Sequence, residues 1–538
     1  MVATTRLNKD TSPLRLLLTK RRSRRRQLGP AAALAAALLI GLAACSSDLL
    51  GHSRVVGYRG GVVADEPHAA LVGREVLVAG GTAGDAAVAT YFALSATLPS
   101  TAGLGGGGVC VAYDPGRKRM EVIEFLPRPT KGGGMAVPAN VRGMALLHSR
   151  FGHLPWTQLL APAEQLARIG TEVSRAFADD LDQPTLIEHA NLAVQELYTD
   201  SSGRPVREGS QLRQTDLAGM LSRIRTFGAG DFYSGLAAHQ LVDAVRGAGG
   251  DLTMDDLRGY LPHIVTPIKE PLGNHWVLLP PPPAAGGAVA ADLYAMTAAA
   301  GYAGAPQAQR VHIMAAAVRR AMAAEAQRAA GQGGEVGTVS RAKMLMADYR
   351  SDGAGPSIPI ELPADAAPPA TSFVVLDNSR EAVACTVTLG GWFGSGRIAS
   401  GTGVAMAAPP SRAGVLSMAP LLVVNTNTEK AFMALGSVDG RYAAAVAVET
   451  LLGTFVERRK LEDILARPRL ADDGQSVLLE PEADDTAQAL EAVGYHLTEV
   501  QHMGRVNAIY CPTDLAVDST ACEAHPDPRG FGLAASVR

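Results

Sequence analysis

Cysteine, aromatic side chains and net charge are all scarce in this sequence. Its 538 residues include 5 cysteines and 3 tryptophans, aromatic residues make up 5%, and the net charge at pH 7 is −3. Such a balance gives no indication of a nucleic acid or a strongly acidic partner. The cysteines and histidines show no spacing typical of a zinc site. We therefore predict no metal, no cofactor and no nucleic acid.

Two common site motifs are also absent. The sequence has no G-x-x-x-x-G-K-[ST] and no G-x-S-x-G, so neither a P-loop nor a typical α/β-hydrolase is supported. The run 103–108 matches G-x-G-x-x-G, but it follows a predicted helix and opens a predicted strand at 109–113. A dinucleotide site needs the glycines after a strand and before a helix. We therefore reject that interpretation.

The remaining composition is that of a large globular protein. Hydrophobic residues make up 47% and charged residues 19%, which allows a sizeable core. The apolar periodicity predicts an α+β fold, with strands towards both ends, a mostly helical middle and sheets packed between helices. The predicted helices are 69–79, one with Asp85 in its first turn that ends at Pro99, 140–150, 157–169, 211–226, 235–248, 308–330 and 442–457. The predicted strands are 61–64, 109–113, 371–377, 382–389, 404–407, 420–424 and 431–435, with a loop at 351–370.

Residues 1–44 have the pattern of an export signal peptide. A basic region at 20–26 precedes the apolar run 29–44, which is short for a membrane span. The run ends in L-A-A-C at Cys45, which resembles a bacterial lipobox and implies cleavage before Cys45 and lipidation of its sulfur. We expect 45–60 to tether an exported lipoprotein to the cell envelope, on the periplasmic side and at the outer membrane. The alternatives are an ordinary secreted protein with an incidental Cys45, and twin-arginine export.

The other four cysteines occur in two settings. Cys110 and Cys385 lie within apolar runs and are predicted to be core residues. Cys511 and Cys522 flank a loop-like segment, and in an exported protein they either form a disulfide or remain free.

The stretch 370–377 gives the first indication of chemistry. It predicts a buried strand that opens at Thr371, directly after the Pro- and Ala-rich segment 363–370. A hydroxyl residue there suits an N-terminal-nucleophile hydrolase, in which the chain cuts itself and the new terminal Thr supplies both hydroxyl and base. A free α-amine, with a pKa of roughly 7.7–8.0, can take the hydroxyl proton near neutral pH. By itself, however, the feature is better explained by an ordinary strand, because Thr is common in strands.

Ten short motifs along the chain change this balance. They are G-V-V-A at 61–64, G-G-T-A-G-D-A-A-V-A at 80–89, G-L-G-G-G-G at 103–108, V-P at 137–138, F-G-H-L-P-W at 151–156, L-L-A-P-A at 159–163, D-F-Y-S-G at 231–235, P-P-P-A-A-G-G at 281–287, F-G-S-G at 393–396 and D-P-R at 527–529. In this order they resemble the γ-glutamyltranspeptidase (glutathione hydrolase) family over most of the chain after the tether.

This resemblance implies an N-terminal-nucleophile hydrolase with an αββα sandwich, in which two sheets lie between helical layers. Members of the family cut themselves before a Thr. Here this predicts a large-subunit-like part at 61–370 and a small-subunit-like part at 371–538, within one integrated domain. The mature enzyme would form a γ-glutamyl ester on that Thr and pass the acyl group to water or an amine. Its partner would be a small γ-glutamyl or other acyl-amide substrate.

The resemblance assigns catalytic roles to Thr371, Thr388 and Gly440. An ungapped comparison, anchored at 382–383 and 393–394, places the family nucleophile on Ala370 and the next residue on Thr371. A one-residue slip near the start of the strand makes Thr371 the nucleophile, which we favour, although such a slip turns strand side chains to the other face. Thr388 matches a Thr that supports the nucleophile. Gly440 retains one half of a Gly-Gly oxyanion pair.

The candidate substrate-binding residues are Arg128, Ser417 and Asp439, and the family pattern is incomplete around them. Leu126 stands where the family has a carboxylate-binding Arg, and Arg128 either replaces that Arg or is an ordinary surface charge. Ser417 remains from a Ser-Ser pair, and Asp439 replaces the first Gly of the oxyanion pair. Gly390 replaces an Asn, and the acidic residue expected at 408–411 is missing. These losses weaken the case for γ-glutamyl specificity more than the case for hydrolysis.

Two functions remain open from the sequence. The first is a self-processing γ-glutamyltransferase or glutathione-hydrolase-like amidohydrolase with an N-terminal Thr nucleophile. The alternative is a catalytically degenerate family member that serves as an envelope binding or scaffold protein.

Overall fold

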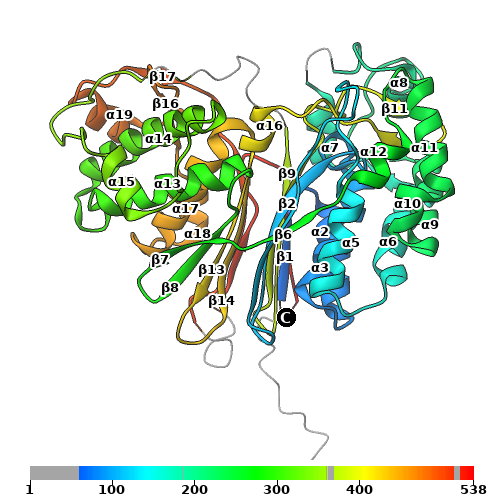
Figure 1. Cartoon of the computed structure of the whole chain (residues 1–538), viewed down its shortest axis with the longest axis horizontal. Helices are drawn as coiled ribbons and strands as arrows, with labels where there is room; N and C mark the ends of the chain where they lie inside the picture. The colour runs from blue at the N-terminus through cyan, green and yellow to red at the C-terminus, as the bar shows by residue number, and fades with distance from the viewer. Residues whose placement is uncertain (1–59, 184–185, 359, 361–368, 514–520, 538) are drawn as a thin grey trace, which may run out of the picture. The chain divides into compact units, whose positions relative to one another are not determined.

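Two β-sheets lie face to face between two layers of helices (Figure 1). The computed structural model describes residues 60–183, 186–358, 360, 369–513 and 521–537. The αββα sandwich expected from the resemblance is confirmed. The signal segment, Cys45 and nearly all of the tether lie outside the described residues. Within the described ranges, no helix combines the length and apolar character needed to cross a membrane.

The first sheet has seven strands in the order β20-β1-β9-β10-β2-β3-β6, and each neighbouring pair is antiparallel. Its two central strands, β9 and β10, are buried along their whole length. They begin and end within a residue of the prediction, because each is a continuous apolar run between turn residues. The strands are β20 (Leu533–Val537), β1 (Gly60–Ala64), β9 (Thr371–Asp377), β10 (Ala382–Thr388), β2 (Gly107–Asp114), β3 (Arg119–Phe125) and β6 (His263–Val265).

The second sheet has six strands in the order β19-β18-β14-β13-β8-β7, again all antiparallel. The strands are β19 (Glu523–His525), β18 (Arg505–Tyr510), β14 (Ala431–Val438), β13 (Met418–Asn425), β8 (His275–Leu279) and β7 (Ile268–Leu272). Smaller ladders are formed by β4 (Thr171–Glu172), β5 (Gln211–Leu212), β11 (Ile398–Ala399), β12 (Val404–Ala405), β15 (Leu470–Asp472), β16 (Val477–Leu479) and β17 (Leu497–Glu499).

Each sheet carries its own helical layer. The first sheet is covered by α2 (Pro67–Val78), α3 (Ala83–Thr97), α5 (Asn140–Phe151), α6 (Trp156–Ile169), α7 (Arg175–Leu181), α8 (Leu192–Tyr198), α9 (Thr215–Phe227), α10 (Ala229–Ser234), α11 (Leu236–Gly247) and α12 (Met254–Gly259). The second is covered by α13 (Ala285–Ala299), α14 (Gln307–Ala329), α15 (Val339–Leu345), α17 (Ala443–Phe455), α18 (Leu461–Ala466) and α19 (Asp484–Glu491). The short elements α4 (Pro99–Ala102), α16 (Arg412–Leu416), η1 (Tyr302–Gly304) and η2 (Gly440–Tyr442) connect them.

The core has three main parts, which correspond to the three contacts between the four layers. One apolar cluster joins the first sheet to its helices, a second joins the second sheet to its helices, and a third lies between the sheets. Helix α3 is buried on every side, because it packs on the first sheet and also against α2, α5 and α6. This explains why its sequence is apolar or small all round instead of amphipathic.

The stretch 263–279 differs from the prediction of a helical middle. It forms β6, β7 and β8, with Pro271 in β7 at the edge of the second sheet. A proline is tolerated at an edge because its missing N–H is not needed by a further strand. The strands are short and half exposed, so their apolar residues do not give a clear period of two.

Both pairs of described cysteines form disulfides. Cys110 on β2 lies directly opposite Cys385 on β10, and the two are bonded. The prediction that they are core residues is correct, since both are fully buried, but their bond was not predicted. Their positions in sequence are 275 residues apart, so only the sheet register brings them together. Cys511 and Cys522 are also bonded, which decides between the two alternatives left open for them.

Candidate active site

Thr371 begins β9, and its hydroxyl is held by a carboxylate. Thr371 Oγ1 donates to Asp65 Oδ2 at 2.8 Å, and the backbone N–H of Ser372 donates to the same oxygen at 3.0 Å. Asp65 directly follows β1, the neighbour of β9 in the sheet. Its other oxygen accepts from Asn507 Nδ2 of the second sheet at 2.7 Å. The carboxylate therefore ties the predicted nucleophile to both sheets.

Alternation along β9 assigns Thr371 and Ala370 to different faces. Phe373 and Val375 pack towards the helices of the first layer, whereas Val374 packs between the sheets. With a side-chain period of two, Thr371 shares the face of Phe373, and Ala370 shares the face of Val374. Both residues are fully buried in the intact chain.

The carbonyl group of Ala370 is held by a cation. Arg505 Nη2, at the start of β18, donates to Ala370 O at 3.1 Å. Arg505 also forms an ion pair with Asp439, with Nε and Oδ2 2.9 Å apart, and Asp439 Oδ1 accepts from the N–H of Ala370 at 3.5 Å. The side chains of Asp439 and Arg505 keep 25% and 19% of their surface exposed, so this corner of the site reaches solvent.

Thr388 reaches the same stretch of chain one residue earlier. The pairing of Thr371 with Val387 places Thr388, at the end of β10, opposite Ala370. Its Oγ1 donates to Pro369 O at 2.7 Å and accepts from the N–H of Gly390 at 2.9 Å. The hydroxyl thus fixes the segment that enters β9.

A further buried acid, Asp180 of α7, belongs to this neighbourhood. Its carboxylate accepts from Ser100 Oγ at 2.5 Å and interacts electrostatically with Arg505 and Asp439. Removal from water raises the pKa of Asp180 to about 7, against the opposing effect of Arg505. Burial would lower the pKa of Arg505, but the carboxylates of Asp439, Asp65 and Asp180 raise it above its usual value. Arg505 is therefore a permanent cation among several carboxylates.

Asp439 and Gly440 form the turn that follows β14. Both have positive φ angles, +81° and +65°, in the region that Asp tolerates and Gly prefers. Ser417 lies next to this turn, one step beyond the pairing of Met418 with Val438. Its hydroxyl donates to Gly414 O at 2.7 Å and is fully buried. Ser417 thus helps to end α16, while Asp439 is the member of this group that contacts Ala370.

Arg128 has a different setting from the other predicted residues. Its guanidinium lies 5.0 Å from the centre of the Tyr260 ring, and its carbonyl accepts from the N–H of Val137 at 2.8 Å. Tyr260 in turn donates to Leu126 O at 2.9 Å. Arg128 is half-buried on this aromatic ring, and its described contacts do not include the Ala370–Thr371 bond. Its role in substrate binding stays a prediction, as do the roles of Thr388, Ser417 and Gly440.

The glycine run 103–108 supports the strand that carries Thr388. A Cβ atom on Gly106 would lie 2.3 Å from Thr388 O, and one on Gly108 would lie 2.4 Å from Thr386 O. The carbonyl of Gly106 also accepts from the N–H groups of Ala139 and Asn140. The run therefore lets two backbone segments approach closely.

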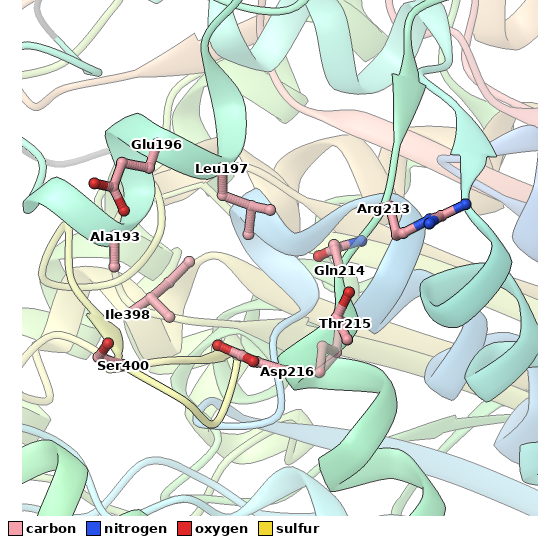
Figure 2. A pocket seen from close by; sticks show the side chains of 11 residues that line it. Ala193, Glu196, Leu197, Arg213, Gln214, Thr215, Asp216, Ile398 and Ser400 are labelled. Carbon is pink, nitrogen blue, oxygen red and sulfur yellow. The ribbon is translucent and has the colours of Figure 1, made fainter.

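A surface hollow of about 290 Å³ lies in the helical layer of the first sheet, and Figure 2 shows side chains that line it. Its lining comes from α8, from the start of α9 and from the segment around Ser400, and includes the charged residues Glu196, Arg213 and Asp216. None of the eleven residues that line it is a predicted site residue. Within the described ranges, no three or more His, Cys, Asp or Glu side chains are grouped to hold a metal ion.

Comparison with known proteins identifies the family. The family model described as gamma-glutamyltranspeptidase matches residues 69–131, 126–409 and 405–537, which is most of the chain. The chain belongs to the γ-glutamyltranspeptidase family. It is 28% identical to the glutathione hydrolase proenzyme of Pseudomonas aeruginosa, over 89% of this chain and 95% of that protein. It is 29% identical to glutathione hydrolase 7 of Homo sapiens, over 84% of this chain and 75% of that protein.

A solved structure supports the same fold for this member of the γ-glutamyltranspeptidase family. Cephalosporin acylase from Bacillus halodurans superposes with a TM-score of 0.75, over 90% of this chain and 97% of that one, at 21% sequence identity. The family and the fold, an N-terminal-nucleophile hydrolase, are therefore those that the motifs indicated.

Sequence reasoning missed several residues of the site. Asp65, Arg505 and Asn507 contact the segment around Thr371, and Asp180 interacts electrostatically with Arg505, yet these residues are distributed over more than 440 positions of the chain. Asp65 gave a usable signal, because it is a charged residue directly after the predicted strand 61–64. The other three gave none, since their role depends on which strand ends and helices meet.

Proposed function

We propose that this chain is a self-processing amidohydrolase, which cuts its own Ala370–Thr371 bond and then acts through the hydroxyl of Thr371. One observation carries the proposal, namely that both reacting groups of this bond are already held. Asp65 accepts the hydrogen bond of the Thr371 hydroxyl, and Arg505 donates to the carbonyl oxygen of Ala370. A base on the nucleophile and a cation on the developing oxyanion are what acyl transfer requires.

In the cleavage step, Thr371 Oγ1 attacks the carbonyl carbon of Ala370 and its proton passes to Asp65. The negative charge that develops on Ala370 O is stabilised by Arg505. The C–N bond then breaks, and the nitrogen of Thr371 takes the proton from Asp65, which leaves Ala370 joined to Thr371 Oγ1 as an ester. Water hydrolyses this ester to give a carboxylate on Ala370 and a free hydroxyl and amine on Thr371.

After cleavage, the new α-amine takes over as the local base, because its pKa of roughly 7.7–8.0 suits proton transfer near neutral pH. The hydroxyl of Thr371 attacks an acyl amide, the leaving amine takes the proton, and water or an acceptor amine releases the acyl group. The names of the relatives, glutathione hydrolase and its proenzyme, support small acyl amides as substrates and a precursor that is processed.

The test is to purify the full chain and to sequence the termini that it contains. We expect two fragments on a reducing gel, the shorter of which begins at Thr371. Thr371→Ala is expected to stay intact, and Thr371→Ser, which retains a hydroxyl, is expected to cut. A wild-type chain that remains whole after long incubation, or one that is cut elsewhere, contradicts the proposal.

A second candidate, a catalytically degenerate binding protein, is favoured by the position of Ala370. This residue lies one step beyond the pairing of Thr371 with Val387, and so opposite Thr388, at the place where the family nucleophile falls in an ungapped comparison. If this candidate holds, the chain stays whole, and replacing Ala370 by Thr restores cutting before residue 370. Cutting of the wild-type chain before Thr371 excludes it.

We also propose that the protein is exported and anchored to the cell envelope through lipidated Cys45. The basic and apolar pattern of residues 20–45 supports this. Mass spectrometry of the mature N-terminal peptide is expected to find a lipidated Cys45, and Cys45→Ala is expected to release the protein from the membrane fraction. An unmodified Cys45 within a longer N-terminus contradicts anchoring.

A further inference from the structure

Ala370 occupies, in the intact chain, the position that a substrate acyl group takes later. This equivalence rests on the proposed function, because Thr371 Oγ1 attacks the carbonyl carbon of Ala370 first and the carbonyl carbon of the substrate afterwards. The groups that contact Ala370 therefore report which acyl group the site accommodates. The chain thus contains a model of its own substrate.

The contacts of Ala370 distinguish its nitrogen from its side chain. Its N–H donates to Asp439 Oδ1 at 3.5 Å, and its carbonyl oxygen accepts from Arg505 at 3.1 Å. Its methyl group is fully buried. The acyl group of Ala370 therefore has a small side chain and a nitrogen on the carbon next to the carbonyl. The site places the carboxylate of Asp439 beside that nitrogen.

The surrounding charges favour a positive nitrogen. Asp439 engages the one guanidinium of Arg505 at 2.9 Å and Asp65 adds a further carboxylate, whereas Asp180, with a pKa of about 7, is only partly ionised at neutral pH. Once the chain is cut and Ala370 has moved out of the site, a substrate nitrogen in the place of the Ala370 N–H would be a free ammonium. A charged donor to a carboxylate forms a shorter and stronger hydrogen bond than an amide does.

We propose that the mature site accepts a small α-aminoacyl group with a free ammonium, bound by Asp439, so that the enzyme removes an alanine-like residue from the amino end of a peptide or amide. A γ-glutamyl group fits this arrangement less well. It has a methylene where Ala370 has its nitrogen, and it would bring a carboxylate to a site in which Arg505 is already paired and Leu126 replaces the expected Arg. In the reaction, water adds to the acyl ester, and its oxygen ends in the carboxylate of the released amino acid.

Four p-nitroanilides separate the features of the acyl group. The alanyl compound has the ammonium, the N-acetylalanyl compound has an uncharged N–H, the propionyl compound has no nitrogen, and the γ-glutamyl compound has the family's acyl group. With the full chain after self-cleavage, we expect kcat/KM for the alanyl compound to exceed each of the others by about tenfold or more. A preference for the γ-glutamyl or the N-acetylalanyl compound, or turnover of none, overturns the inference.

Asp439→Asn tests the assigned contact. Asn has the same shape and tolerates the positive φ angle at this position. We expect the preference for alanyl over N-acetylalanyl anilide to fall about tenfold, while propionyl anilide is still hydrolysed. The matched control, Asp179→Asn, changes an exposed carboxylate next to Asp180 and is expected to keep the wild-type preference.

An unchanged preference in Asp439→Asn contradicts the inference, even if the chain cuts itself normally. A wild-type chain that never cuts itself contradicts the proposed function and removes the basis of this inference.

Discussion

Arg505 donates a hydrogen bond to the carbonyl oxygen of Ala370 across 3.1 Å, although the two residues are 135 positions apart. The bond connects the beginning of β18 to the segment that enters β9. It places a guanidinium where negative charge develops if Thr371 attacks that carbonyl. Several consequences for the bond, for its surroundings and for the processed protein can be measured.

Removing this donor is expected to slow self-cleavage. Loss of one donor to an oxyanion typically costs about 10²–10³ in rate. Arg505→Met should therefore cut far more slowly than the wild type, and Arg505→Lys, which retains the cation without the planar fork, should lie in between. The rate is followed on reducing gels after synthesis of the full chain. Arg350→Met, at an exposed side chain, is the control. Equal rates in all four proteins contradict the role of Arg505.

Asp180 is expected to make stability depend on pH. Its pKa is about 7 in the folded protein and about 3.9 in an unfolded chain. Between these values the folded state holds a proton that the unfolded state lacks, so stability falls as pH rises from about 4 to 7 and stays lower above that. Asp180→Asn removes the charge and retains the shape. Its free energy of unfolding should match that of the wild type at pH 4 and exceed it by up to about 4 kcal/mol at pH 8. The melting temperatures of the two proteins, measured at both pH values, should show the same trend.

The control for this effect is Asp182→Asn, at an exposed residue that follows the same helix and is not among the groups that shift the pKa of Asp180, so the pH dependence should stay unchanged. If the free energies of unfolding of wild type and Asp180→Asn differ by the same amount at pH 4 and at pH 8, burial does not raise the pKa of Asp180.

The disulfide between Cys110 and Cys385 is expected to join the two products of cleavage. Cys110 precedes the bond at 370/371 and Cys385 follows it, whereas Cys511 and Cys522 both follow it. The processed protein should therefore run as one band without reductant and as two bands with it. The double variant Cys110→Ala and Cys385→Ala should give two bands in both conditions, and should be less stable by about 2–5 kcal/mol. Two bands from unreduced wild-type protein contradict the bond.

A side chain at position 106 is expected to destabilise the fold. A methyl group there would lie 2.3 Å from Thr388 O, so either the glycine run or the end of β10 must shift. We expect Gly106→Ala to cost about 1–3 kcal/mol of stability, as overpacking does, and to slow self-cleavage by displacing Thr388. Gly219→Ala is the matched control, because a methyl group in that exposed helical position meets no atom within 4 Å and should be neutral or stabilising. A Gly106→Ala protein as stable and active as the wild type contradicts this account.

The order of the elements was largely determined by the sequence alone. Strands such as β9 and β10 were predicted within a residue, because continuous apolar runs bounded by turn residues specify inner strands locally. Helices α2, α3, α5, α6 and α14 followed from apolar spacing and from signals such as Asp85 in a first turn. The glycine run was correctly placed between a helix and a strand.

The arrangement around Thr371 was decided only by the tertiary structure. The partners come from two distant strand ends, Asp65 from the end of β1 and Arg505 and Asn507 from the beginning of β18, and the bond between Cys110 and Cys385 depends on the register of β2 against β10. Local patterns specify which residues form a strand, because side-chain period and burial are properties of neighbouring positions. They do not specify which strand ends meet, or which face Thr371 and Ala370 occupy, because these depend on packing between segments hundreds of residues apart.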